Sequence, residues 1–149
     1  MLATAFATVA LLPGLLSPTV ADVKAQTPLR ILLPSTMQTD ETELFASGEG
    51  DSRGYQVVVS TVEDCGANAC SLAFFSATKG GKAYGSRPAT LANGRRGRYT
   101  PLSCGGSCSP PSITWRERGV VYEIQMDFAR NPRASLVRMA NSAIRRGAR

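Results

Sequence analysis

The sequence predicts an α+β domain: an antiparallel sheet of about five to seven strands, with one C-terminal amphipathic helix packed on it and disulfide bonds stapling its loops. Three observations lead to this fold class. Short segments of alternating apolar and polar residues recur through the middle of the chain. A stretch with helical spacing closes the chain. Finally, 149 residues that are 43% hydrophobic are enough for one domain and too few for two comfortable ones, and the four cysteines suit a stapled fold.

The N-terminal segment, MLATAFATVALLPGLLSPTVADVKAQ, predicts an export signal over residues 1–25, followed by a single domain over residues 26–149. It is apolar, carries small residues before two candidate cleavage sites, and then turns polar. A cut after Ala25 is favoured over one after Ala21. No Lys or Arg follows Met1 directly, which indicates that the signal begins further upstream.

The alternative for this segment is a buried N-terminal helix. We expect Pro13, Gly14 and Pro18 to interrupt such a helix. The segment is also too short and too broken by proline to span a bilayer well. The mature protein is therefore predicted to be exported to the periplasm or the extracellular space, with no transmembrane span.

The first half of the domain predicts a few strands separated by loops. RILLP, which stops at Pro34, predicts a first strand, and the acidic segment 35–54 predicts a loop with one short strand. YQVVVSTVE alternates and predicts a strand over residues 55–63. SLAFFSAT, residues 71–78, is apolar on both faces and ends in a glycine turn, which predicts a central strand.

Two hairpins are predicted next. ATLANGRRGRYTP places two short strands around Asn93-Gly94, a pair that favours a tight turn. SITWRERGVVYEIQM, residues 112–126, predicts a second hairpin with its turn at Gly119, hereafter the Trp hairpin. Trp115 and Tyr122 lie on the faces of this hairpin that we expect to be buried in the core.

The chain ends in a segment predicted to be helical from Pro132 to Arg146, with Asn131 as its N-terminal cap and Gly147 as its end. Its apolar stripe comprises Leu136, Val137, Met139, Ala140, Ala143 and Ile144. We expect this stripe to cover the sheet face formed by Val120, Tyr122, Ile124 and Met126.

The cysteines form two close pairs, Cys65 with Cys70 in DCGANAC and Cys104 with Cys108 in CGGSC. In an oxidising compartment such pairs predict disulfides, and four cysteines allow three connectivities. The glycine-containing loops favour the two local bridges, although loop entropy would favour cross-pairing. A four-cysteine zinc site is the alternative, but neither pair has the two-residue spacing common in zinc knuckles.

Positive charge is concentrated in the second half of the chain: residues 79–149 carry 14 Lys or Arg against 3 Asp or Glu, whereas residues 1–78 carry 3 against 8. The hairpin segment NGRRGRY supplies Arg95, Arg96 and Arg98, and the Trp hairpin adds Arg116 and Arg118. Arginines interleaved with aromatic residues can hold phosphate, carboxylate or sugar-acid groups. The competing interpretation is a solvated basic edge that discourages pairing between sheets.

An enzyme is not expected. With no histidine in the chain, a Ser-His-Asp triad, a Cys-His pair and any histidine metal site are excluded. Carboxylate pairs such as Glu63 with Asp64 lack any sign of a cleft, and GEGDSRG lacks the acidic spacing of a calcium loop. No cofactor, catalytic residue or metal ligand is predicted.

Three segments carry a resemblance to known proteins: DCGANAC, the block CGGSCSPPSITWRERGVVYEIQ, and MANSAI in the final helix. Together they resemble a family of small uncharacterised exported bacterial proteins of the kind abundant in cyanobacteria, over most of residues 28–149. The C-terminal part is distantly similar to the tail of extracytoplasmic domains of anti-sigma-factor-like sensors. The resemblance implies export and an α+β domain, and it carries no catalytic motif.

The sequence thus predicts an exported binding or sensing module of the cell envelope, with a basic hairpin for an anionic partner. An anionic polysaccharide, a lipid head group or an acidic protein segment would suit that charge, and nucleic acid ranks lower because an exported protein seldom meets it. The alternative is a structural or accessory envelope protein with protein partners and no ligand.

Overall fold

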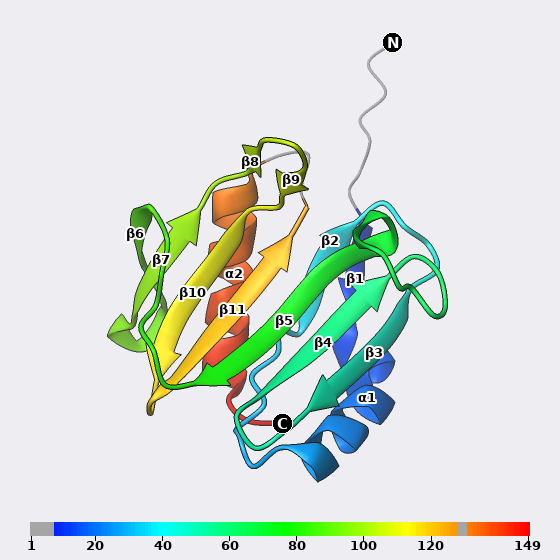
Figure 1. Cartoon of the computed structure of the whole chain (residues 1–149), viewed down its shortest axis with the longest axis horizontal. Coiled ribbons are helices and arrows are strands. Elements are labelled where there is room, and N and C mark those ends of the chain that lie inside the picture. Colours follow the sequence, from blue (N-terminus) through cyan, green and yellow to red (C-terminus); the bar gives the residue numbers. More distant parts are fainter. Residues whose placement is uncertain (1–7, 128–130) are drawn as a thin grey trace.

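The computed structural model describes residues 8–127 and 131–149, and within them the chain forms one seven-stranded sheet, two two-stranded ribbons and two α-helices (Figure 1). In chain order the elements are β1 (Thr8–Leu11), α1 (Leu12–Gln26), β2 (Thr36–Thr39), β3 (Phe45–Gly50), β4 (Gly54–Ser60), the 3₁₀ turn η1 (Asn68–Cys70), β5 (Ser71–Lys79), β6 (Arg87–Thr90), the 3₁₀ turn η2 (Ala92–Gly94), β7 (Arg96–Thr100), β8 (Ser103–Cys104), β9 (Cys108–Ser109), β10 (Ser112–Glu117), β11 (Val120–Met126) and α2 (Pro132–Arg146).

The main sheet has the strand order β3-β4-β5-β11-β10-β7-β6, and every neighbouring pair is antiparallel. The predicted fold class is therefore confirmed. β5 lies between β4 and β11, as predicted for a central strand. The Trp hairpin turns at Arg118 and Gly119, which both have positive φ, and the Asn93-Gly94 pair turns in the same way between β6 and β7.

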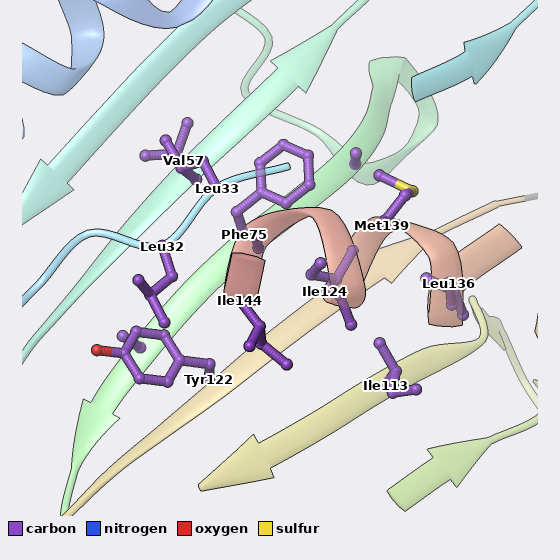
Figure 2. Packing of buried hydrophobic residues seen from close by; sticks show 14 of the residues in the cluster. Leu32, Leu33, Val57, Phe75, Ile113, Tyr122, Ile124, Leu136, Met139 and Ile144 are labelled. Atoms are coloured by element: carbon purple, nitrogen blue, oxygen red, sulfur yellow. The ribbon is translucent and has the colours of Figure 1, made fainter. Parts of the chain in front are cut away.

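Both helices pack on the same face of the sheet, hereafter the helix face (Figure 1). One row of cross-strand partners across this face runs Gly48, Val57, Phe75, Ile124 and Ile113. In Figure 2, side chains of α2 lie over this row. The opposite face, hereafter the open face, is covered by neither of the two described helices.

The predicted bounds of α2 are confirmed, and its apolar stripe is buried apart from Val137, which is half-buried. Leu136 and Ala140 are fully buried against the sheet. Gly147 ends the helix with a φ of 75°. Asn131 stands at the N-cap, but its side chain makes no capping hydrogen bond because its backbone is left-handed there, with a φ of 44°.

The prediction that RILLP is a strand is wrong. Ile31, Leu32 and Leu33 are buried, but their segment is irregular and pairs with no strand. Its backbone is bound by side chains instead: the Tyr55 hydroxyl accepts from the Leu32 N–H at 3.0 Å and lies 3.3 Å from the Leu32 carbonyl, to which it donates. The apolar pattern correctly indicated that this segment is buried. It wrongly indicated that a neighbouring strand would bind its backbone.

The expectation that prolines interrupt an N-terminal helix is also wrong. α1 is continuous from Leu12 to Gln26 because its first proline lies in the opening turn, where no helical N–H is needed, and Pro18 is accommodated inside it. One side of α1 is buried; its buried residues are Leu12, Leu16, Thr19, Val20 and Val23. Of the segment predicted to be an export signal, residues 1–7 lie outside the described residues, residues 8–11 form β1, and the rest belongs to the packed helix α1.

The acidic segment holds more structure than predicted. β2 pairs with β1, and β3 is an edge strand of the main sheet. The glycines of β3 explain the weak sequence signal, because they face α1 where a side chain would not fit. A Cβ at Gly48 would lie 2.8 Å from methyl carbons of both Thr19 and Val23.

The local disulfide pairing is confirmed. Cys65 bonds to Cys70 in the β4–β5 connection, and Cys104 bonds to Cys108 across the β8–β9 ribbon. All four thiols are used, so the four-cysteine zinc alternative does not apply to this oxidised form.

Candidate functional site

The structure separates the five predicted arginines. Arg95 lies at the margin of the helix face, where its Nη2 is 2.8 Å from Oε1 of Glu117. Arg30 reaches the same carboxylate oxygen at 3.1 Å. Glu117 is only 8% exposed, so Arg30, Arg95 and Glu117 form a structural ion-pair cluster. Arg95 is therefore not free to bind an anion.

Arg98 is directed to the open face by strand alternation, since its neighbours Gly97 and Tyr99 are buried on the other side. Its Nε and Nη2 both donate to the Gly85 carbonyl, at 3.0 and 2.8 Å. A carbonyl leaves the positive charge of the guanidinium uncompensated. Arg98 therefore has a structural partner and still contributes positive potential.

Arg96, Arg116 and Arg118 are exposed, and none of them forms an ion pair with another described residue. Trp115 pairs with Gly97 in the β10–β7 ladder, so the next residues along, Arg116 and Arg96, are neighbours on the open face. Arg118 stands apart at the tip of the Trp hairpin.

One pocket combines two of these arginines with a third that the sequence did not single out. It has a volume of about 510 Å³ and lies along β6 and β7; its lining residues are Pro88, Ala89, Thr90, Arg96, Gly97, Arg98 and Arg133. We call it the arginine pocket. Three arginines and one threonine line it, and the described lining contains no Asp or Glu.

Arg133 reaches the pocket from the first turn of α2. Its Nη2 donates to the Pro88 carbonyl at 2.6 Å, and its guanidinium lies 5.7 Å from the centre of the Tyr99 ring. Sequence reasoning missed Arg133 because it is far along the chain from the basic hairpin. Nothing in the local sequence pattern places the first turn of α2 beside Pro88.

A second pocket lies on the open face, about 270 Å³ in volume and lined by Ser76, Thr78, Gly80, Gly81, Lys82, Tyr84, Val121 and Glu123. It is bounded by the strap, which we define as residues 80–86, between β5 and β6. The Tyr84 hydroxyl donates to the Glu123 carboxylate. Burial and that carboxylate raise the pKa of Tyr84, so its hydroxyl stays protonated at neutral pH.

The described residues offer neither a metal site nor a membrane-spanning helix. Within residues 8–127 and 131–149, no three His, Cys, Asp or Glu side chains gather closely enough to hold a metal ion. Over the same residues, neither helix has the length and apolar character needed to cross a membrane.

Comparison of the chain with protein-family models, with curated proteins and with solved structures finds no significant match. The functional conclusion therefore depends on the geometry of this molecule.

Proposed function

We propose that this protein is an exported binding module of the cell envelope that holds an anionic group of its partner in the arginine pocket. The observation that carries the proposal is the convergence of Arg96, Arg98 and Arg133 on one concavity whose described lining has no acid. Guanidinium groups bind carboxylate, sulfate and phosphate oxygens through charge-assisted hydrogen bonds.

The pocket has both a free and a fixed part. Arg98 and Arg133 are held by backbone carbonyls, which fixes their guanidinium groups before a ligand arrives. Arg96 makes no ion pair with a described residue, so its donors are available. Part of the site is thus preorganised, which lowers the entropy cost of binding.

Export is supported by the two disulfides, because such bonds persist in oxidising compartments. The proposed signal and α1 use the same residues, and a cut after Ala25 would remove nearly all of α1. The intact mass of protein recovered from the envelope identifies the N-terminus that the working protein has.

The experiment compares two charge-matched variants, Arg96→Glu in the arginine pocket and Arg118→Glu outside it. Both change the net charge equally, and both sites are exposed. Binding to immobilised polyglutamate, a carboxylate polymer, is measured over a range of salt concentrations. We expect Arg96→Glu to weaken binding by about tenfold or more, because it loses a charge-assisted bond and adds repulsion.

Arg118→Glu should weaken binding much less, and the parent's affinity should fall steeply with salt. Equal losses in the two variants would mean that net charge alone attracts the polymer. In that case the arginine pocket is a solvated edge, and the binding proposal fails.

A further inference from the structure

The main chain of the strap is fixed to the open face at two consecutive residues, Tyr84 and Gly85. The Tyr84 N–H donates to Oγ1 of Thr114 at 2.9 Å, and that hydroxyl donates to the Tyr84 carbonyl at 2.6 Å. Arg98 holds the next carbonyl, that of Gly85. Gly85 is required there, because its φ is 146° and a Cβ would lie 3.0 Å from the backbone of Arg98.

These contacts hold an aromatic ring at the surface. Tyr84 is 52% exposed, although its main chain is bonded on both sides and its hydroxyl is bonded to Glu123. An exposed side chain held at its main chain and at its tip loses little entropy when a ligand covers it. Its position beside the 270 Å³ pocket on the open face gives a ligand both a ring and a cavity.

The pocket beside Tyr84 has the chemistry that a sugar ring requires. Val121 supplies an apolar patch, the hydroxyls of Ser76 and Thr78 can donate or accept, and Glu123 accepts while Lys82 donates. A sugar has apolar C–H faces that lie on an aromatic ring and hydroxyls that need both donors and acceptors. A purely apolar or purely basic ligand would leave part of this lining unmatched.

The arginine pocket lies along the β6 edge of the sheet, and two of its arginines, Arg96 and Arg98, are on the open face with the pocket beside Tyr84. Arg98 pairs with Thr114, and Thr114 pairs with Glu123, so Arg98 of the arginine pocket and Glu123 of the second pocket are two strand spacings apart, or about 10 Å. Arg98 connects the two, since it lines the arginine pocket and holds the strap that carries Tyr84. One polysaccharide chain can span that separation, with two of its nearby sugar residues reaching the two pockets.

Building on the proposed function, we propose that the partner is an acidic polysaccharide: an acidic group enters the arginine pocket, and a sugar ring further along the same chain lies on Tyr84. Tyr84 supplies the preference for sugar, and the arginines supply the preference for negative charge. The two contributions can therefore be removed one at a time.

The test measures binding of the full chain to polygalacturonate, a carboxylated polysaccharide, and to polyglutamate, which carries carboxylates without sugars. We expect the parent to prefer polygalacturonate. Tyr84→Ala should lower the affinity for polygalacturonate about tenfold and leave the affinity for polyglutamate unchanged. Tyr84→Trp should keep the preference, because it keeps a ring. A melting curve of each variant shows that the sheet is intact.

The possible failures are distinguishable. If Arg96→Glu weakens both polymers while Tyr84→Ala and Tyr84→Trp change neither, the arginine pocket stands and the polysaccharide is wrong. If Arg96→Glu changes neither, the proposed function fails as well. Vesicles of phosphatidylglycerol are the third probe: binding that equals or exceeds that of polygalacturonate, and that competes with it, would overturn the polysaccharide in favour of a lipid head group.

Discussion

Buried and half-buried tyrosine hydroxyls fix the irregular parts of this chain to its sheet. Tyr55 holds Leu32 by two hydrogen bonds, and the Tyr122 hydroxyl donates to the Arg30 carbonyl at 2.9 Å. These contacts satisfy the backbone of a buried segment that has no strand partner, as a buried peptide group requires. Trp115 stacks on Tyr122 with ring centres 5.5 Å apart, so the predicted core role of both aromatics is confirmed.

We expect Tyr55→Phe to destabilise the domain by about 1–3 kcal/mol, because it leaves the N–H and C=O of Leu32 buried without a partner. Urea unfolding measures the change. Tyr99→Phe is the matched control, since Tyr99 is also buried but its hydroxyl makes no hydrogen bond with a described residue. Equal costs for the two variants would contradict the role given to Tyr55.

Tyr55→Phe should also change how the stability of the domain depends on pH in the alkaline range. Burial raises the pKa of the Tyr55 hydroxyl well above its ordinary value. The folded state therefore keeps a proton that the unfolded state releases near pH 10, so this contribution to stability is complete below about pH 10 and falls as the pH rises further. Tyr55→Phe should show a smaller loss of stability over that alkaline range than the parent does.

Among the elements, the contact between α1 and β3 depends on glycine. Gly48 leaves room for Thr19 and Val23, and Gln26 at the end of α1 accepts a hydrogen bond from the Gly50 N–H at 3.1 Å. A strand with two such glycines is weak by propensity, since glycine has no side chain to pack. The helix and the strand therefore depend on each other.

We expect Gly48→Ala to destabilise the full chain by about 1–3 kcal/mol, because the new methyl group collides with α1. In a chain that begins at Gln26 the same substitution should be neutral or mildly stabilising, since alanine lowers the entropy of the unfolded state. Thermal melting of the full and the shortened chain, each with and without Gly48→Ala, measures both effects. The close Gln56 carbonyl, at 3.1 Å, is common to both chains and cancels in the comparison.

Gly14→Ala is the control within α1, because Gly14 is exposed and nothing lies within 4 Å of its Cβ position. It should stabilise the full chain by roughly 0.5–1 kcal/mol. An identical effect of Gly48→Ala with and without residues 1–25 would show that α1 does not pack on β3.

Sequence patterns predicted the strongly periodic elements well and missed those whose partners are distant. β5, the Trp hairpin and α2 have patterns long enough to define their type. RILLP was misread because nothing local reveals that Tyr55 would bind its backbone. The sequence predicted two residues of the arginine pocket, Arg96 and Arg98, because clustered arginines indicate positive charge. It could not predict that Arg133 joins them from α2, or that Glu117 neutralises Arg95.

Across the whole molecule, the strand order separates the charges along the sheet. Residues 45–79 form the side with β3, β4 and β5, and residues 87–117 form the side with β6, β7 and β10. The basic half of the sequence thus becomes a basic side of the fold, with the arginine pocket at its edge. Such an asymmetry draws an anionic partner toward that side.

The two disulfides close the connections β4–β5 and β7–β10, and both lie at the same end of the sheet, because β5 and β10 run in the same direction (Figure 1). Each bridges only a short segment, with sequence separations of 5 and 4. Neither ties one core element to another that is distant in the sequence. Their effect on stability must therefore come from restricting short loops in the unfolded chain.

We expect reduction to leave the domain folded and to lower its melting temperature. Loop entropy gives about 2 kcal/mol for each bridge, against a typical total stability of about 5–15 kcal/mol. The double variant Cys104→Ser/Cys108→Ser should cost less than Cys65→Ser/Cys70→Ser, because the first pair is exposed and the second is half-buried. Melting curves of both variants, with free thiols counted by mass spectrometry after alkylation, measure this order. Complete unfolding on mild reduction would show instead that the sheet and helices cannot hold the fold without the bridges.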